Sequence, residues 1–313
     1  TTGLTMSIRE ELTKLAPLQD SILSIGVFDG VHLGHRHLIA RLIEEASQLG
    51  LVPGIVTFRD HPESVVAGGS APMLLSNLDD RIDLLKELGV GLVVPVTFDE
   101  TLSKLPAREF VSLLQQTLRM RALVVGPGFA LGHRREGDVA KLKSLGRELG
   151  YKVRLVDASV SDDSRPITST LIREVLREGD VERVVGLLGR RFSLSGDVVS
   201  GEGRGATLGF PTANLNTADE IALPADGIYA TWAYTAGDRF MASANVGLSP
   251  TFAETGRTVE AFLLEFRGNL YGQLLRLEFV RRIRDEMKFD NVAALQRQVD
   301  QDVLLTRDIL AHS

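Results

Sequence analysis

Residues 24 to 35 read SIGVFDGVHLGH, and this stretch decides how the first half of the chain folds. An apolar run leads into it, three glycines spaced four residues apart follow, and His32 and His35 begin a helical pattern. Glycine permits positive φ and close backbone approach, so we predict a strand, a tight turn and a helix start. Ligands of open parallel sheets bind beyond the carboxyl ends of strands, and helix N-termini attract anions. The stretch therefore predicts a phosphate-binding turn.

The two histidines are the polar groups of this turn. Imidazoles beside a helix start are placed to hydrogen-bond a phosphate and to offset charge that develops in a transition state. Two other interpretations stay open from the residues alone. One is a metal site of His32, His35 and His37 with Asp29 as the nearby acid, although the chain has no cysteine. The other is a set of ordinary polar residues at a helix start.

Length and composition narrow the class of protein. A chain of 313 residues fits two domains, and a net charge of −6 argues against the basic field of a nucleic-acid binder. Its apolar runs are too short to cross a bilayer, and the N-terminus lacks the apolar segment of a signal peptide, so residues 1 to 5 read as an extension. Zero cysteines suit a cytosolic enzyme. We expect a cytoplasmic protein that binds neither nucleic acid nor membrane.

The hydrophobic pattern changes once along the chain. Up to residue 186 short apolar runs alternate with amphipathic helical patterns, which predicts an α/β domain built on a parallel sheet, of the Rossmann-like type. From residue 187 to 313 period-two segments separated by glycine-rich turns predict a small antiparallel barrel, and a helical pattern closes the chain. We therefore predict two domains, 1–186 and 187–313, with their boundary near residues 186 to 191.

Two segments of the first domain resemble a known family. The pattern Gly26-x-Phe28-Asp29-x-x-His32-x-Gly34-His35 is similar to the signature of the nucleotidylyltransferases, and ITSTLIR at residues 167 to 173 is similar to their second signature. Serine and threonine cap helices, and an arginine one turn inside neutralises phosphate. The resemblance implies that His32 and His35 stabilise the transition state. It implies nucleotide binding by Gly26, Phe28, Asp29, Gly34, Thr168, Ser169, Thr170 and Arg173.

The stretch GEGRGATLGFPTANL, residues 201 to 215, contains the candidate phosphate-binding and metal-binding residues of the second domain. A glycine-rich loop holds phosphates through its N–H groups, but it also serves as a plain hairpin connection. Side-chain oxygens of Thr212 and Asn214 are hard ligands that suit Mg²⁺. The end of the stretch resembles the riboflavin kinase signature. That resemblance implies nucleotide binding by Gly203, Arg204, Gly205, Gly209, Phe210 and Pro211.

Glu260 is a lone carboxylate in the strand pattern TVEAFLLEF. Because side chains alternate along a strand, that of Glu260 lies on one face with Phe262 and Leu264. The side chains of Val259, Ala261 and Leu263 lie on the opposite face. Phosphorylation of a hydroxyl needs a carboxylate that takes the proton, and Glu260 is the candidate for that base. A buried ion pair is the alternative role.

The resemblance runs from about residue 20 to 305 and is to the bacterial bifunctional riboflavin kinases and FAD synthetases. It implies that ATP with Mg²⁺ phosphorylates riboflavin to FMN, and that a second ATP adenylylates FMN to FAD with release of pyrophosphate. The sequence does not indicate an oligomeric state. Segments in the family's order imply flavin contacts by Phe58, His61, Phe129, Arg284, Glu286 and Phe289, although a charged helix start would look like residues 284 to 289.

Four positions depart from the family's pattern. Asp60 replaces a proline, Gly128 a polar residue, Ala206 an arginine and Phe262 a histidine. These departures keep two other functions open. One is a riboflavin kinase whose first half is a weak or altered nucleotidylyltransferase, and the other is a flavin-binding protein without catalysis.

Overall fold

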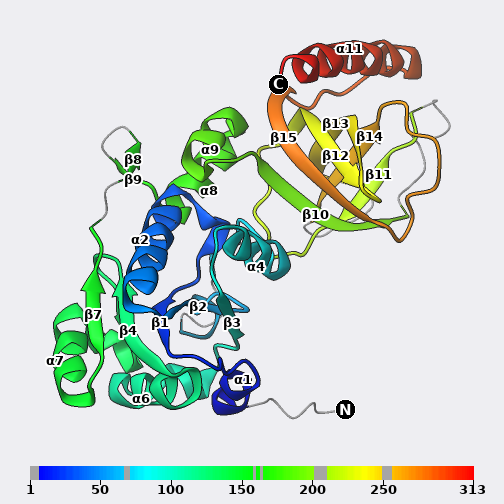
Figure 1. Cartoon of the computed structure of the whole chain (residues 1–313). Helices are drawn as coiled ribbons and strands as arrows, with labels where there is room; N and C mark the ends of the chain where they lie inside the picture. Colours follow the sequence, from blue (N-terminus) through cyan, green and yellow to red (C-terminus); the bar gives the residue numbers. More distant parts are fainter. Residues whose placement is uncertain (1–6, 67–70, 158–159, 163–164, 201–209, 249–255) are drawn as a thin grey trace. The chain divides into compact units, whose positions relative to one another are not determined.

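The computed structural model describes residues 7–66, 71–157, 160–162, 165–200, 210–248 and 256–313. The chain forms two compact units (Figure 1). The first comprises residues 1–74 and 78–167, and the second comprises residues 75–77 and 168–313. Residues 168–188 therefore have most of their contacts within the same unit as the barrel. The predicted domain boundary between residues 186 and 187 concerns which part of the chain folds by itself, and it stays a prediction.

The first unit is built on a five-stranded parallel sheet with the strand order β3-β2-β1-β4-β7. Its strands are β1 (Ser21–Ile25), β2 (Val52–Phe58), β3 (Leu92–Val96), β4 (Met120–Val125) and β7 (Lys152–Leu155). All five residues of β1 are buried, because helices cover both faces of the sheet. The predicted α/β class with a parallel sheet is confirmed.

Two cores flank this sheet. One joins strand residues to helices α1, α6 and α7, and the other joins them to α2 and α4 (Figure 1). The helices are α1 (Ile8–Lys14), α2 (Leu33–Leu49), α3 (Glu63–Val66), α4 (Leu78–Glu87), α5 (Glu100–Ser103), α6 (Ala107–Leu118) and α7 (Val139–Leu149), with the 3-10 turns η1 (Asp29–Val31) and η2 (His133–Arg135). The short strands β5 (Ala130–Leu131) and β6 (Gly137–Asp138) pair, as do β8 (Ser161–Asp162) and β9 (Arg165–Pro166).

The second unit opens with α8 (Ser169–Glu178) and α9 (Val181–Leu188) and continues into a closed antiparallel barrel with the order β10-β11-β14-β13-β12-β15. The barrel strands are β10 (Phe192–Val199), β11 (Ala213–Asn216), β12 (Gly227–Thr235), β13 (Asp238–Leu248), β14 (Arg257–Leu263) and β15 (Leu274–Arg284). Helix α11 (Val292–Ala311) packs on β12, β13 and β15. The predicted barrel and terminal helix are confirmed.

Three details differ from the sequence expectations. Residues 213 to 216 form strand β11 rather than part of a loop, and the side chains of Ala213 and Leu215 are buried in the barrel. Two alternating buried positions are too few to predict a strand from the sequence. Residues 285 to 290 are not the start of a helix, since α11 begins at Val292 after its N-cap Asn291. Leu264 lies past the end of β14 and is buried, so it does not share the face of Glu260.

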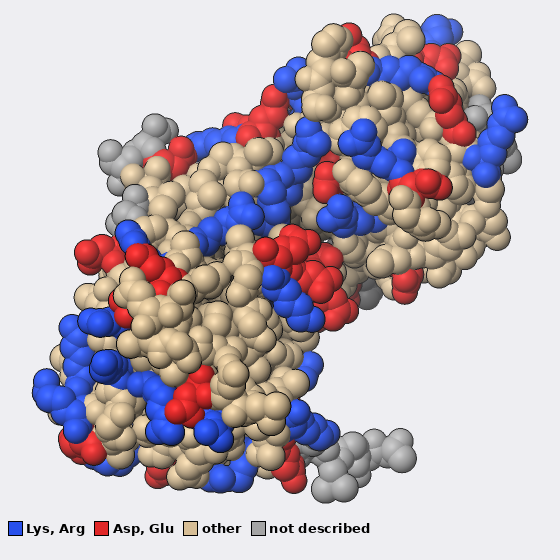
Figure 2. Space-filling model, in the orientation of Figure 1, with Lys and Arg blue, Asp and Glu red and all other residues tan. Residues whose placement is uncertain are grey.

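Basic and acidic side chains are interspersed on the face of the molecule that Figure 2 presents. This distribution agrees with the small net charge of −6. Within the described ranges no helix is both long enough and apolar enough to cross a bilayer.

Candidate active sites

The predicted phosphate-binding turn lies at the centre of the parallel sheet. β1 is flanked by β2 and β4, so the strand order reverses beside it, and ligands of such sheets bind at that reversal. The turn starts where β1 ends, with the N–H of Gly26 donating to the carbonyl of Val56 at 3.1 Å. The connections that follow β2 and β4 leave the same edge of the sheet.

The backbone of the turn is strained. Phe28 has a φ of 53° and Val31 a φ of 40°, values that side-chain-bearing residues seldom adopt, and Gly30 lies between them at 73°. Both nonglycine side chains are buried in the core, which holds the backbone in this conformation. Strain of this kind collects at ligand-binding turns, where it fixes the direction of backbone N–H groups.

His32 caps helix α2. Its Nδ1 accepts the backbone N–H of His35 at 3.3 Å, and the two imidazole rings stack at 3.7 Å between centroids with an interplanar angle of 20°. Because Nδ1 is an acceptor in this arrangement, the ring proton of His32 lies on Nε2. Only 5% of His32 is exposed, so the cap and the stack fix the direction of this donor.

Gly34 explains why the first signature needs a glycine inside the helix start. A Cβ there would lie 3.1 Å from the His32 ring and 3.0 Å from the carbonyl oxygen of Ile167. Ile167, the first residue of the second signature, therefore lies close to Gly34 of the first. The next residue, Thr168, caps α8 through its Oγ1, which accepts the N–H of Leu171 at 3.2 Å.

The remaining residues of the second signature lie on α8. Arg173 is buried with 6% exposure, and Ser169 and Thr170 lie in the first turn of the helix. Their predicted contacts with nucleotide stay predictions. Phe28 and Asp29, predicted in the same role, are 2% exposed each, and their contacts with nucleotide also stay predictions.

His35 is an uncharged imidazole in this site. Burial, with the neighbouring His32 and Arg81 adding to it, lowers the pKa of His35 well below the 6.5 of a free histidine. Within the described residues, no group of three or more His, Cys, Asp or Glu side chains is placed to hold a metal ion. The structure thus gives no support to a metal site at these histidines.

This shift predicts how stability depends on pH. Between the lowered pKa of folded His35 and about 6.5 the unfolded chain binds the proton and the folded chain does not, so stability falls as pH drops through this window. We expect the unfolding transition of the parallel-sheet unit to move to lower urea between pH 7.5 and 5.5. His35→Gln, which cannot titrate, is expected to flatten this dependence. An unchanged slope in the variant would contradict the assignment.

The other residues predicted for the first site lie along the same sheet edge. Phe58 ends β2 and packs edge-on against Phe98 at 5.4 Å, with 9% exposure, and its contact with flavin stays a prediction. His61 follows it, and its Nδ1 accepts the N–H of Glu63 at 3.3 Å. Phe129 follows β4 and is half-buried. Gly128 has a φ of 71°, which a glycine adopts at least cost, so the departure at this position matches the local backbone.

The predicted residues of the second site meet on the barrel. Strand register places Asn214 opposite Glu260 and Glu260 opposite Asn245, which makes a row across β11, β14 and β13. The hydroxyl of Thr212 donates to Glu260 Oε2 at 3.3 Å. Glu260 is half-buried on the outer face while its neighbours Val259 and Ala261 fill the barrel. In the described part of the chain Glu260 has no ion pair, so the alternative of a structural salt bridge finds no partner there.

Asn245 is the member of this row that the sequence did not assign to the site. Its Oδ1 is buried and has no hydrogen-bond partner among the described residues. The oxygens of Thr212 and Asn214 beside a carboxylate fit a hard cation such as Mg²⁺, which prefers oxygen ligands. The predicted nucleotide residues Gly203, Arg204, Gly205 and Gly209, and the departure Ala206, lie outside the described residues.

Phe210 and Pro211 lead into this row. The ring of Phe210 packs edge-on against Phe262 at 5.5 Å, and Pro211 is exposed. Phe262, which departs from the family's histidine, therefore has an aromatic packing partner that its phenyl ring suits.

Among residues 284 to 289, predicted to contact flavin, Arg284 ends β15 and the others form neither helix nor strand. Arg284 is held by Asp302 of α11 through two N–H donors, at 2.7 and 3.0 Å, and this pair is nearly buried. The Glu286 carboxylate lies against Gly247, where a Cβ would come within 1.8 Å of its Oε1. Partial burial, with Asp226 adding to it, raises the pKa of Glu286.

These contacts separate the roles of the segment. Arg284 fastens the segment to the terminal helix, so the described contacts give it a structural role. Glu286 lies beside Asn245, which donates to its carboxylate and belongs to the row of Glu260. Phe289 lies 6.0 Å from the guanidinium carbon of Arg284. Their contacts with flavin stay predictions.

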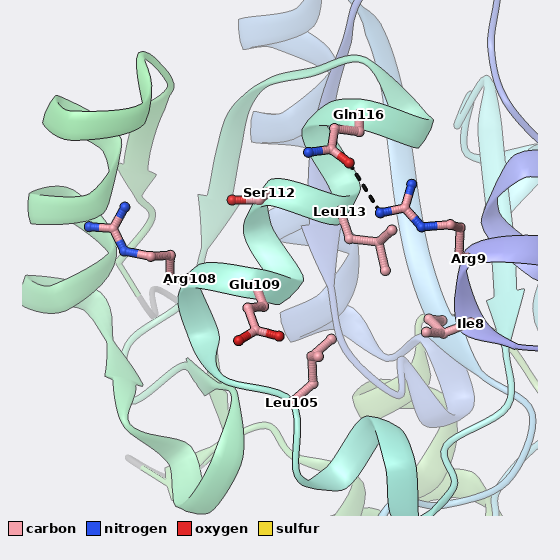
Figure 3. Close-up of a pocket in the computed structure, with 8 residues that line it drawn as sticks. All are labelled: Ile8, Arg9, Leu105, Arg108, Glu109, Ser112, Leu113 and Gln116. Carbon is pink, nitrogen blue, oxygen red and sulfur yellow. Dashed lines mark hydrogen bonds between the residues drawn. The ribbon is translucent and has the colours of Figure 1, made fainter.

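A groove of about 460 Å³ lies elsewhere on the first unit, between α1 and α6 (Figure 3). Arg9 donates to Gln116 across it at 3.1 Å. None of the residues predicted for either site lines it, so it is separate from both. Its lining residues are Ile8, Arg9, Leu105, Arg108, Glu109, Ser112, Leu113 and Gln116.

Both halves of the chain match known protein families. A family model described as FAD synthetase matches residues 15–171, and one described as riboflavin kinase matches residues 188–310. The bifunctional riboflavin kinase/FMN adenylyltransferase of Escherichia coli K12 is 35% identical over 295 residues, 94% of each chain. The Bacillus subtilis protein of that name is 32% identical over 301 residues, 94% of this chain and 92% of its own. A solved structure titled as a macrolide-efflux protein from Streptococcus pneumoniae has a TM-score of 0.84 at 29% identity and covers 95% of this chain and 96% of its own.

Proposed function

Because this chain belongs to the family of bifunctional riboflavin kinases/FMN adenylyltransferases, we propose that its barrel unit makes FMN at Glu260 and that its parallel-sheet unit makes FAD at the His32 turn. The observation that supports the proposal is that each unit brings together predicted site residues that are distant in sequence. Thr212 and Asn214 lie beside Glu260 on the barrel, and the His32 ring and the carbonyl oxygen of Ile167 both lie close to Gly34 in the parallel-sheet unit.

In the kinase reaction Glu260 takes the proton of the ribityl hydroxyl as that oxygen attacks the γ-phosphorus of ATP, the bond from this phosphorus to the bridging oxygen breaks, and ADP leaves. Thr212 and Asn214 are the residues that would hold Mg²⁺ with the nucleotide. The bound ion would neutralise charge on the phosphates. The hydroxyl of Thr212 also orients the carboxylate by donating to Oε2.

In the adenylylation reaction a phosphate oxygen of FMN attacks the α-phosphorus of ATP, and pyrophosphate leaves. The nucleophile is already an anion, so this step needs no general base. The Nε2–H of His32 and the N-terminus of α2 supply positive potential for the charge that develops on the α-phosphate. Arg173 stays the predicted partner of the leaving pyrophosphate.

The test is chromatography of the products after the full chain is incubated with riboflavin, ATP and Mg²⁺. FAD is expected. FMN alone would favour a kinase with an altered first half, and unchanged riboflavin would favour a flavin-binding protein without catalysis. A cytoplasmic location also stays a prediction.

A fragment of residues 187 to 313 is predicted to form FMN but no FAD, because the barrel has its own ligands and base. The structure adds that α9 buries Val184, Leu187 and Leu188 and packs on β10 and β15, and that Glu182 pairs with Arg281. We therefore expect a fragment of residues 168 to 313 to have the same activity and a higher melting temperature. Folded fragments without kinase activity would contradict separable function.

A further inference from the structure

Arg81 is the largest fully buried side chain of the described structure, although its helical pattern, LDDRIDLLKE, is rich in charge. It lies on α4, which packs against η1 of the phosphate-binding turn. A buried arginine is rare unless a partner balances its charge. Neither sequence signature includes Arg81, so the family resemblance does not explain why it is buried.

The guanidinium joins the helix to the ends of two strands. Its Nη1 donates to the carbonyl of Val27 at 2.7 Å and lies 3.4 Å from the hydroxyl of Thr57. That hydroxyl also donates to the Val27 carbonyl, at 2.9 Å. Val27 is the residue between Gly26 and the strained Phe28, so these bonds fix the backbone where the turn begins.

Two carboxylates and two imidazoles lie around Arg81. Asp29 of η1, which is 2% exposed, and Asp60 after β2 both stabilise the charged guanidinium, while His32 caps α2 and His35 lies in its first turn. Nε and Nη2 of Arg81 and Nδ1 of His35 are buried and have no hydrogen-bond partner among the described residues. A proton on His35 would put a second positive charge near the guanidinium in a buried place, which burial and the like charge both disfavour.

We propose that Arg81 is a positioning residue for adenylyl transfer: it fixes the Val27 carbonyl at the start of the turn and keeps His35 an uncharged hydrogen-bond donor. The inference rests on the proposed adenylylation site. Its physical basis is that burial and a neighbouring cation both disfavour a proton on His35, whereas the guanidinium is a far stronger base and is stabilised by Asp29 and Asp60. His35 then holds one protonation state across the neutral pH range.

The first test is an NMR titration of the histidine rings in the unmodified full chain, with His35 assigned by comparison with His35→Gln. We expect His35 to stay neutral down to well below pH 6.5. A normal titration near 6.5 would overturn the proposal, whatever the enzyme's activity. Conversion of supplied FMN to FAD, measured separately on the same protein, tests the proposed function itself.

The second test compares Arg81→Met, which removes the charge, with Arg81→Lys, which keeps it. In Arg81→Met we expect the His35 pKa to rise, adenylylation of FMN to fall at least tenfold, and an acidic limb to appear in its pH profile between pH 6 and 7. Arg81→Lys is expected to keep His35 neutral and to recover most of the rate. Arg121→Met, at an exposed arginine that pairs with Asp20, is the matched control and should leave the His35 pKa, the adenylylation rate and its pH profile unchanged.

Riboflavin phosphorylation in the same preparations reports on the other unit and should stay at the parent rate. If Arg81→Met does not fold, Arg81→Lys still decides the matter, since an ordinary His35 titration in that variant would contradict the proposal. If His35 stays neutral in Arg81→Met and the pH profile matches that of the parent, Arg81 contributes only to packing and the proposal is wrong.

Discussion

Glu260→Gln is expected to lower riboflavin phosphorylation by about 10² to 10⁴-fold, because glutamine keeps the size of the side chain and its hydrogen bonds but cannot accept a proton. The hydroxyl of Thr212 can still donate to the amide oxygen, so the row across β11, β14 and β13 should persist. Adenylylation of supplied FMN should stay at the parent rate. The measurement pairs thermal unfolding with FMN formation on one preparation.

Glu278→Gln is the matched control for this substitution. Glu278 is also a barrel glutamate with partners, since it accepts from Tyr234 at 3.0 Å and pairs with Arg276 at 3.1 Å, but it lies on β15, outside the row. We expect a modest loss of stability and unchanged kinase turnover. If Glu260→Gln instead melts early and phosphorylates riboflavin at nearly the parent rate, Glu260 is a structural carboxylate and the catalytic assignment is wrong.

The fold was largely predictable because both halves of the chain have regular hydrophobic periods. Runs such as VPGIVTF became strands buried on both faces, and the alternation in TVEAFLLEF placed Glu260 outside the barrel and Val259 inside it. Strand β11 was missed because it has two inward side chains, too few for a period to emerge from one sequence.

The parts of the site that the sequence did not reveal depend on tertiary packing. Arg81 stands in a charged helical segment, where the usual outcome is a solvated face, and only the fold turns it toward Val27. The contacts of the segment from Arg284 to Glu286 also depend on the fold. Arg284 pairs with Asp302 of α11, and Glu286 lies against Gly247 of β13. No local spacing links those positions, so a motif identifies the segment but not its partners.

The cap of α2 makes His32 a residue with two separable roles, and a pair of substitutions distinguishes them. His32→Ala removes the Nε2–H and the Nδ1 acceptor together, so we expect FAD formation to slow by about a hundredfold or more. Loss of the cap should also cost about 0.5–2 kcal/mol of stability. His32→Asn retains a capping oxygen in place of Nδ1 but does not reach as far as Nε2.

His32→Asn is therefore expected to melt like the parent and to form FAD as slowly as His32→Ala, because only the distant donor is lost. FMN formation by the barrel should be normal in both variants. The measurement is FAD formation from supplied FMN, with thermal unfolding and riboflavin phosphorylation on the same samples. If His32→Asn restores FAD formation, the helix cap is what the reaction needs from this residue. Equal loss of both activities would show that His32 does not act at one site alone.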